Sequence, residues 1–288
     1  MVLWILQVIM RIIWRVKVWN KLIKYIRANF NLASLKAILV ILLLTNTYAH
    51  ADCDKAFISN IANQIDAKVD EYNYQKLFSC KEIENQGIKV LAFAVYNPEL
   101  TKIDPFFKGG VENASDGRYD LNVVVVSKDS NKIITKYTNS GVLESDAVAL
   151  TNVIIDNRYG KLNNHSLILD VTARNAANSH SYISDHTKLF LFEFKKNSLT
   201  QLINGLDVYS YHGNIEENPE KNLFENMERT LKFTKKLTNS KPDILISEIN
   251  CQTNNETGDC KGIANTNKIK HFLKFDGRKY PIPKRLNH

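Results

Sequence analysis

The chain has 288 residues, a hydrophobic content of 44% and few glycines and prolines, which excludes a fibrous or broadly disordered protein. Its formal charge of +8 would suit nucleic acid or an anionic surface, but seven basic and no acidic residues precede Asp52. The remaining 31 basic and 30 acidic residues nearly balance, so we expect no nucleic-acid partner for the part of the chain after residue 51.

The first 51 residues have the features of a secretory signal. Basic residues precede an apolar stretch, Ala37–Leu44, and the small-residue motif Ala49–Ala51 follows it. This order is that of a cleaved signal, and we predict cleavage between Ala51 and Asp52. An uncleaved anchor is the alternative, but the apolar stretch is shorter than the about 20 residues that span a bilayer. We therefore expect a periplasmic protein that meets the membrane only through its leader, before cleavage.

All four cysteines follow the predicted cleavage site. An even number of cysteines in an exported chain indicates disulfides. Three pairings are possible, and the grouping of the cysteines near the two ends of the domain favours Cys53–Cys80 and Cys251–Cys260. Zinc is the alternative, but it would require C-x2-C-like spacing, which the sequence lacks. We predict two disulfides, no metal and no cofactor.

The first element after the leader is a predicted helix over residues 54–74. Apolar side chains recur there at three-to-four spacing, which is typical of an amphipathic helix: Phe57, Ile58, Ile61, Ile65 and Val69. Asp52 or Asp54 can cap its first turn. The predicted Cys53–Cys80 disulfide would attach this helix to the first strand region.

From Gly87 onward, β-branched and aromatic runs alternate with turn residues. The predicted strands cover residues 88–96, 119–126, 132–137, 166–172, 188–194, 199–203, 207–211, 229–234, 243–249, 269–275 and 279–282. Asp276-Gly277 predicts a hairpin before the last of them. Residues 139–152 are compatible with a short helix, and residues 178–187 and 214–225 with polar loops.

One helix and about ten strands joined by hairpins predict antiparallel sheets. We predict a signal segment over residues 1–51 and a single mainly β domain over residues 52–288, built as a two-sheet antiparallel sandwich with an N-terminal helix. A propeller-like meander is the alternative, because the hairpins near residues 121–137 and 188–203 resemble each other. No fixed-period repeat supports it.

Two features of the C-terminal half are shared with other exported proteins. An aromatic strand, a turn and a leucine-rich return occupy residues 189–203: Leu189, Phe190, Leu191, Phe192, Phe194, Leu199, Leu202 and Ile203. A final strand ends in Asp-Gly before a tyrosine, at Phe272–Gly277 and Tyr280. In these features the chain resembles a loose group of uncharacterised exported bacterial β-rich proteins. The resemblance implies fold and compartment, and it implies no catalytic residue.

The best catalytic candidates lie in residues 180–186, where His180, Asp185 and His186 accompany two serines. Histidines can bind metal or act as a base near neutral pH. A solvated polar loop between two strands is the favoured interpretation, because such loops collect these residue types. Turn formation and sheet packing likewise explain three other groups: a calcium-like set at Asp129 and Asn131, a second at Asp116 and Asp120, and an aromatic patch of Tyr209, Tyr211 and His212.

No short catalytic or phosphate-binding motif is present. We therefore favour a non-catalytic binding or interaction protein, such as an inhibitor, an immunity-type protein or an accessory of the cell envelope, with a protein or envelope component as its partner. The alternatives are an envelope hydrolase that uses residues 180–186 and a purely structural envelope domain.

Overall fold

A computed structural model of the chain describes residues 53, 55–65, 77–84, 86–100, 117–156, 158–163, 166–178, 182–216, 222–254, 260 and 266–286. By internal contacts the chain divides into Met1–Ala51 and Asp52–His288, and every described residue belongs to the second unit. The predicted leader and its cleavage site lie outside the described residues.

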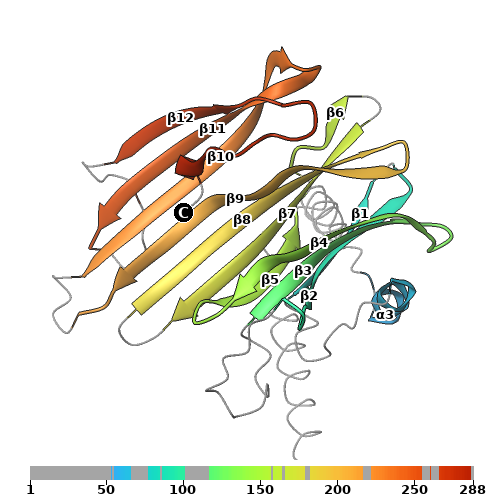
Figure 1. The fold of residues 1–288 in the computed structure, drawn as a ribbon, viewed down its shortest axis with the longest axis horizontal. Coiled ribbons are helices and arrows are strands. Elements are labelled where there is room, and N and C mark those ends of the chain that lie inside the picture. The colour runs from blue at the N-terminus through green and yellow to red at the C-terminus, as the bar shows by residue number, and fades with distance from the viewer. Residues whose placement is uncertain are drawn as a thin grey trace, which may run out of the picture. The chain divides into compact units, whose positions relative to one another are not determined.

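The described chain forms two antiparallel sheets (Figure 1). The smaller sheet has the order β1-β2-β3-β4, with β1 (Phe78–Ile83), β2 (Ile88–Tyr96), β3 (Gly117–Ser127) and β4 (Ile133–Ser145). The larger sheet has the order β12-β11-β10-β9-β8-β7-β5, and β6 also pairs with β7. Its strands are β5 (Ala149–Ile155), β6 (Lys161–Asn163), β7 (Ser166–Asn178), β8 (Tyr182–Lys195), β9 (Ser198–Asn214), β10 (Leu223–Thr238), β11 (Lys241–Thr253) and β12 (Asn267–Leu273).

The two sheets pack face to face, which confirms the predicted sandwich. The core between them combines residues of β2 and β3 with residues of β5, β7, β8 and β9. The run Val123–Val126 shows how one strand serves two cores. Val123 and Val125 point into the sandwich, whereas Val124 and Val126 join a second cluster on the other face. Because β3 is buried on both faces, its apolar residues form a continuous run and do not alternate with polar ones.

Helix α3 (Lys55–Gln64) covers the outer face of the smaller sheet. Its apolar stripe of Phe57, Ile58 and Ile61 packs on β2 and β3. The disulfide between Cys53, which precedes the helix, and Cys80 links the start of the helix to β1. The predicted helix is thus confirmed over residues 55–64. Residue 54 and residues 66–74 of the prediction lie outside the described residues.

The C-terminal segment covers part of the larger sheet, and here one prediction is wrong. Asp276 does form a turn, since its Oδ1 accepts the N–H groups of Arg278 (2.7 Å) and Lys279 (2.8 Å), but no strand follows at residues 279–282. Tyr280 instead crosses the sheet: its N–H donates to Leu202 O (2.8 Å), and its hydroxyl donates to Pro242 O (2.6 Å). The prolines at 281 and 283 have no N–H to donate to a strand ladder.

The C-terminal segment ends in the short 3-10 helix η2 (Lys284–Leu286). Tyr280 and Leu286 are almost fully buried in an apolar cluster that also contains Leu202 of β9 and Ile244 of β11. This cluster lies on the face of the larger sheet opposite the sandwich core.

Three other predictions differ from the structure. No helix forms over residues 139–152, because β4 continues through a bulge at Gly141 (φ 62°) and β5 begins at Ala149. The predicted strands 199–203 and 207–211 are one strand, β9, with irregular pairing and Gly205 at φ 72°. The bulges interrupt the two-residue periodicity from which the strands were predicted. The predicted polar loops are shorter, since β8 already begins at Tyr182 and β10 at Leu223.

Candidate functional site

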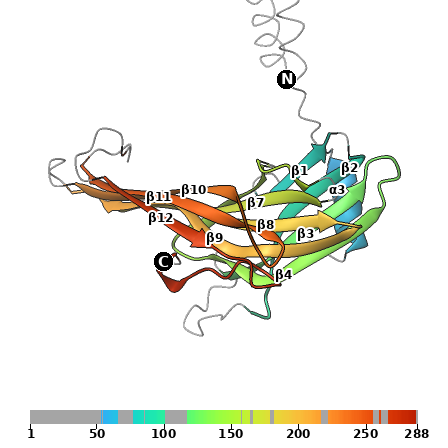
Figure 2. The ribbon, with the colours of Figure 1, turned by 90° about the horizontal axis from the view of Figure 1, so that it is seen from above.

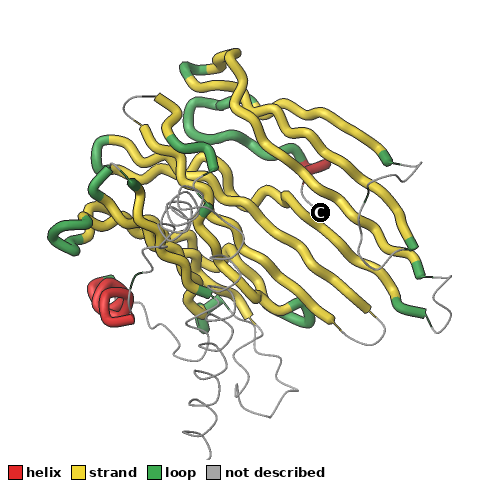
Figure 3. Tube along the Cα trace, turned by 180° about the vertical axis from the view of Figure 1, so that it is seen from behind, coloured by secondary structure: helices red, strands yellow, loops and turns green. Residues whose placement is uncertain are grey.

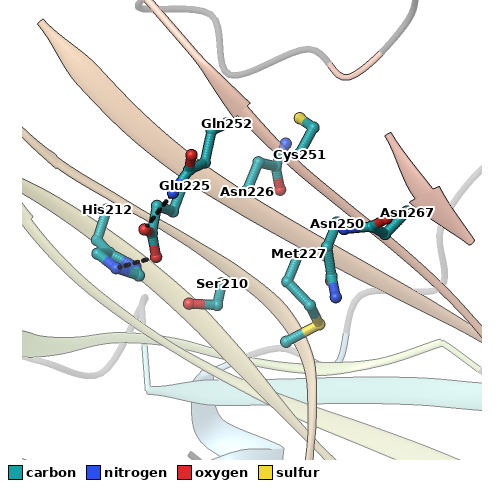
Figure 4. A pocket seen from close by; sticks show the side chains of 9 residues that line it. All are labelled: Ser210, His212, Glu225, Asn226, Met227, Asn250, Cys251, Gln252 and Asn267. Carbon is teal, nitrogen blue, oxygen red and sulfur yellow. Dashed lines mark hydrogen bonds and ion pairs between the residues drawn. The ribbon is translucent and has the colours of Figure 1, made fainter. Parts of the chain in front are cut away.

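The strongest candidate site lies in the larger sheet, where strands β9 and β10 pair over only part of their length. Strands β9 and β10 pair only through Tyr209–Asn214 and Leu223–Glu228, although both strands are much longer. Over this paired part lies a hollow of about 540 Å³ (Figure 4). Residues of β9, β10, β11 and β12 line it, including the disulfide-bonded Cys251 of β11: Ser210, His212, Glu225, Asn226, Met227, Asn250, Cys251, Gln252 and Asn267.

Strand register places most of these side chains in two rows. Directly opposed residues of antiparallel strands project to the same face. The first row runs across four strands through Ser210, Met227, Asn250 and Asn267. The second row runs across three strands through His212, Glu225 and Gln252. Asn226 and Cys251 sit between the rows in sequence and project the other way, as Figure 4 shows.

The second row is a chain of polar contacts around one carboxylate. Glu225 Oε2 lies 3.3 Å from His212 Nε2, and Glu225 Oε1 accepts a hydrogen bond from Gln252 Nε2 (2.9 Å). The His212 and Glu225 side chains are 45% and 51% exposed. An ion pair in such an environment contributes little to stability, so these groups remain available to a ligand.

The first row offers hydrogen-bonding groups beside an apolar side chain. Asn250 Nδ2 donates to Glu248 Oε1 (2.7 Å), while the buried Asn250 Oδ1 accepts no hydrogen bond within the described structure. A buried acceptor without a partner costs about 1–3 kcal/mol. Because this oxygen is buried, it adds no acceptor to the open surface of the hollow.

A buried charged network supports the hollow from its side. Arg229 Nε donates to Glu248 Oε2 (2.7 Å), and Arg229 Nη1 donates to Asp207 O (2.8 Å) and Leu286 O (2.7 Å). His271 Nε2 lies 3.5 Å from the same carboxylate. Burial raises the pKa of Glu248, but the hydrogen bonds from Arg229 and Asn250 outweigh it, so the pKa lies below its ordinary value. Arg229 thereby joins β9, β10, β11 and the C-terminal segment.

The structure does not bring the predicted catalytic candidates together. Asp185 binds Arg174 through two contacts, Nε–Oδ1 at 2.8 Å and Nη2–Oδ2 at 2.5 Å. Its neighbour His186 lies opposite Asn175 and lines a separate hollow of only about 90 Å³. Adjacent residues of a strand project to opposite faces, and both residues belong to β8, so the predicted loop is wrong for residues 182–187. His180 lies outside the described residues.

His186 nevertheless has a distinct electrostatic environment. Burial lowers the pKa of its imidazole, and the positive charge of Lys188 lowers it further. The adjoining hollow is about the size of a few water molecules, so it cannot receive a substrate.

The weaker candidates are also distributed. Asp120 Oδ1 accepts hydrogen bonds from Asn97, Ser140 and Gly141, which occupies it within the fold. Tyr211 is buried and stacks on Phe224 with 5.5 Å between ring centroids, whereas its neighbour His212 lines the hollow. Asp116 lies outside the described residues. Among the residues that the structure describes, no group of three or more His, Cys, Asp or Glu is arranged to hold a metal.

Both predicted disulfides are present, Cys53–Cys80 and Cys251–Cys260. Two disulfides fit an oxidising extracellular or periplasmic location. Within the described part of the chain, no helix combines the length and the apolar character needed to cross a bilayer.

Comparison with known proteins finds no relative: no family model, no curated protein and no solved structure matches the chain. The resemblance of the C-terminal half to exported β-rich proteins therefore stays a prediction, and the functional argument depends on the hollow itself.

Proposed function

We propose that the chain is an exported, periplasmic binding protein without catalysis, and that the hollow receives an extended polypeptide segment of a partner. The leader pattern and the two disulfides support export. The observation that carries the binding role is the pair of side-chain rows on one open face, Ser210 to Asn267 and His212 to Gln252.

The chemistry of the rows favours a polypeptide. Side-chain amides both donate and accept hydrogen bonds, as a peptide backbone does. Asn250, Gln252 and Asn267 supply such amides. Met227 lies in the same row and offers a soft apolar contact to a side chain of the partner. The volume of about 540 Å³ is within the usual range of about 300–1,000 Å³ for ligand sites.

Site-specific photo-cross-linking tests this proposal. A photoreactive amino acid replaces Gln252 at the hollow or, as the control, the exposed Thr200 on β9 of the same sheet. Both chains are produced in a periplasm and irradiated. We expect one discrete protein adduct from position 252 and none from position 200.

A second substitution makes the test specific to the hollow. Ser210→Tyr places a bulky ring in the first row, so it should remove the adduct at position 252, whereas Thr200→Tyr should leave it unchanged. Adducts of equal yield from both positions, or an adduct that persists in the Ser210→Tyr chain, would show that the hollow is not the binding surface.

One observation favours hydrolysis as a second candidate. Ser210, His212 and Glu225, three residue types that hydrolases combine, line the same hollow. A nucleophile requires a base within hydrogen-bond reach, and Ser210 and His212 share no hydrogen bond among the described contacts. We expect ester and peptidoglycan-fragment turnover at the level of buffer, with Ser210→Ala unchanged; serine-dependent turnover would instead establish a hydrolase.

A further inference from the structure

The near-neutral charge of the chain after the leader conceals a strong segregation. Residues 52–228 contain 18 basic and 25 acidic residues, whereas residues 229–288 contain 13 basic and 5 acidic residues. The change coincides with Arg229, the first residue of β10 beyond its pairing with β9. The positive excess is therefore confined to the rest of β10, to β11 and β12, and to the C-terminal segment.

Burial strengthens this separation at the surface. In the described part of residues 229–286, ten basic side chains are exposed: Lys232, Lys235, Lys236, Lys268, Lys270, Lys274, Arg278, Lys279, Lys284 and Arg285. The carboxylates of Asp243 and Glu248 are only 1% and 6% exposed. Asp276 is the one exposed carboxylate of this described region, and its Oδ1 already accepts two backbone N–H groups.

Four of these lysines and one apolar residue project to the same face of the outer strands, and we call this surface the basic edge: Lys232, Lys268, Lys270, Phe272 and Lys274. Strand register places Lys232, Leu245 and Phe272 in one cross-strand row. Lys270, Lys268 and Lys274 project to the same face as Phe272, because they lie two, four and two residues from it along the chain.

The position of the basic edge leaves it open to a large partner. Strand β12 pairs only with β11 and is the outermost strand of the larger sheet. Figure 2 shows β10, β11 and β12 projecting away from the smaller sheet. The hollow opens on the opposite face: Asn267, in its first row, and Lys268 are neighbours on β12 and project to opposite sides.

Lysines on an edge strand also have a protective role, because they discourage pairing with other strands. That role accounts for Lys268 and Lys270, and it opposes pairing of β12 with a second copy, which would place lysines against lysines. It does not account for Lys232, which lies on β10. Nor does it account for Phe272, which is 56% exposed among these cations.

We propose that the basic edge docks the exported domain on an anionic membrane surface. Lysines near anionic headgroups together with aromatic and aliphatic side chains are the composition of interfacial membrane binding. The lysines contact lipid phosphates, Phe272 enters the headgroup boundary, and the acidic remainder of the domain turns away. In this orientation the hollow stays accessible on the face away from the bilayer.

Vesicle co-sedimentation of the exported, processed chain tests the proposal. We expect binding to phosphatidylcholine vesicles that contain phosphatidylglycerol and little binding to phosphatidylcholine alone. Raising the salt concentration should weaken the binding, because exposed charges are screened. Equal binding to both vesicles, or binding to neither, would overturn the proposal.

Two triple variants with the same change in total charge locate the surface. Lys232→Glu, Lys268→Glu and Lys270→Glu alter the basic edge, whereas Lys132→Glu, Lys136→Glu and Lys195→Glu alter exposed lysines elsewhere. We expect about tenfold weaker binding or more for the first set and less than about twofold for the second. Equal losses would attribute binding to net charge and overturn the docking surface.

A single substitution separates the apolar contribution from charge. Phe272→Ser should weaken binding and leave its salt dependence unchanged, and no change would contradict insertion of this ring. Thermal unfolding of each variant verifies the fold. Cross-linking from position 252 reports the hollow independently, so failure of membrane docking and failure of peptide binding are distinguishable.

Discussion

The inner half of the larger sheet (β5 and β7 to β9) and its outer half (β10 to β12) differ in how far their residues are buried. In β7, all residues from Ser166 to Ala173 are buried, because the smaller sheet covers one face and the C-terminal segment contributes to the cover on the other. In β12, Asn267 to Lys270 are all exposed. Figure 3 shows the outer strands beside the inner ones, and the two sets are joined through the paired part of β9 and β10. The comparison teaches that one sheet supplies stability at one end and an open surface at the other.

The join between the halves depends on Arg229, and its substitution has the largest expected effect. Arg229→Met keeps the length of the side chain but leaves Glu248 buried without this cation and removes the hydrogen bonds from Arg229 to the carbonyls of Asp207 and Leu286. Breaking a buried ion pair in this way costs about 3–5 kcal/mol. Urea unfolding of the processed chain measures the loss.

Arg174→Met is the matched control for this experiment. Arg174 also binds a carboxylate, Asp185, but its side chain is 51% exposed, compared with 1% for Arg229. We expect a loss of less than about 1 kcal/mol from the control. Equal losses would mean that Arg229 is not the join between the halves.

The difference between the halves also explains which parts of the fold were predictable. The inner strands are continuous apolar runs, so residues 121–126 and 189–194 indicated buried strands by composition alone. In β4 and β9 the register shifts and left-handed glycines interrupt the two-residue periodicity, so a helix and two separate strands were predicted there. The turn at Asp276 is present and led to the prediction of a following strand. The hydrogen-bond partners of Tyr280 are instead Leu202 and Pro242, which lie 78 and 38 residues before it in the sequence and so could not be inferred from local pattern.

The site was largely beyond sequence reasoning for a similar reason. Its first row joins residues 210, 227, 250 and 267, which come together only through the register of four strands. The sequence groups His212 with Tyr209 and Tyr211 of the same strand, but Tyr211 is buried against Phe224 and only His212 lines the hollow. The available signal was the repeated Asn or Gln within predicted or neighbouring strand segments, at Asn250, Gln252 and Asn267. Without the register, that signal cannot be told from loop composition.

The two disulfides allow a second comparison of the halves, with a smaller expected effect. Cys53–Cys80 spans 27 residues and attaches the helix to the smaller sheet, whereas Cys251–Cys260 spans 9 residues beside the hollow. In the chain-entropy description, the longer loop gives the larger stabilisation, about 3–4 kcal/mol compared with about 2–3 kcal/mol. Serine substitution of each pair, followed by urea unfolding, tests this order.

The two disulfides should rank in the opposite order by their effect on binding at the hollow. Replacing Cys251 and Cys260 should reduce cross-linking at position 252, because the pair closes the chain next to the hollow. Replacing Cys53 and Cys80 should leave that cross-linking intact at temperatures where the chain is folded. If both replacements affected the adduct equally, the outer half would not be the separate binding region that the structure indicates.

The smallest expected effect is a pH dependence that originates in the inner half, at His186. Burial and the charge of Lys188 lower the pKa of this imidazole in the folded chain below its ordinary value of about 6.5. As the pH falls through that value, the unfolded chain therefore binds a proton before the folded chain does, and the free energy of unfolding decreases. The decrease ends at the lower, folded-state pKa. His186→Gln should remove this component between neutral and mildly acidic pH, measured as urea unfolding at a series of pH values.

Lys188→Gln sharpens the assignment, because it preserves the imidazole and removes only the second cause of the lowered pKa. We expect the acid-dependent decrease to become smaller in this variant without disappearing, since burial remains. A profile identical to that of the unmodified chain in both variants would show that another group governs the pH dependence.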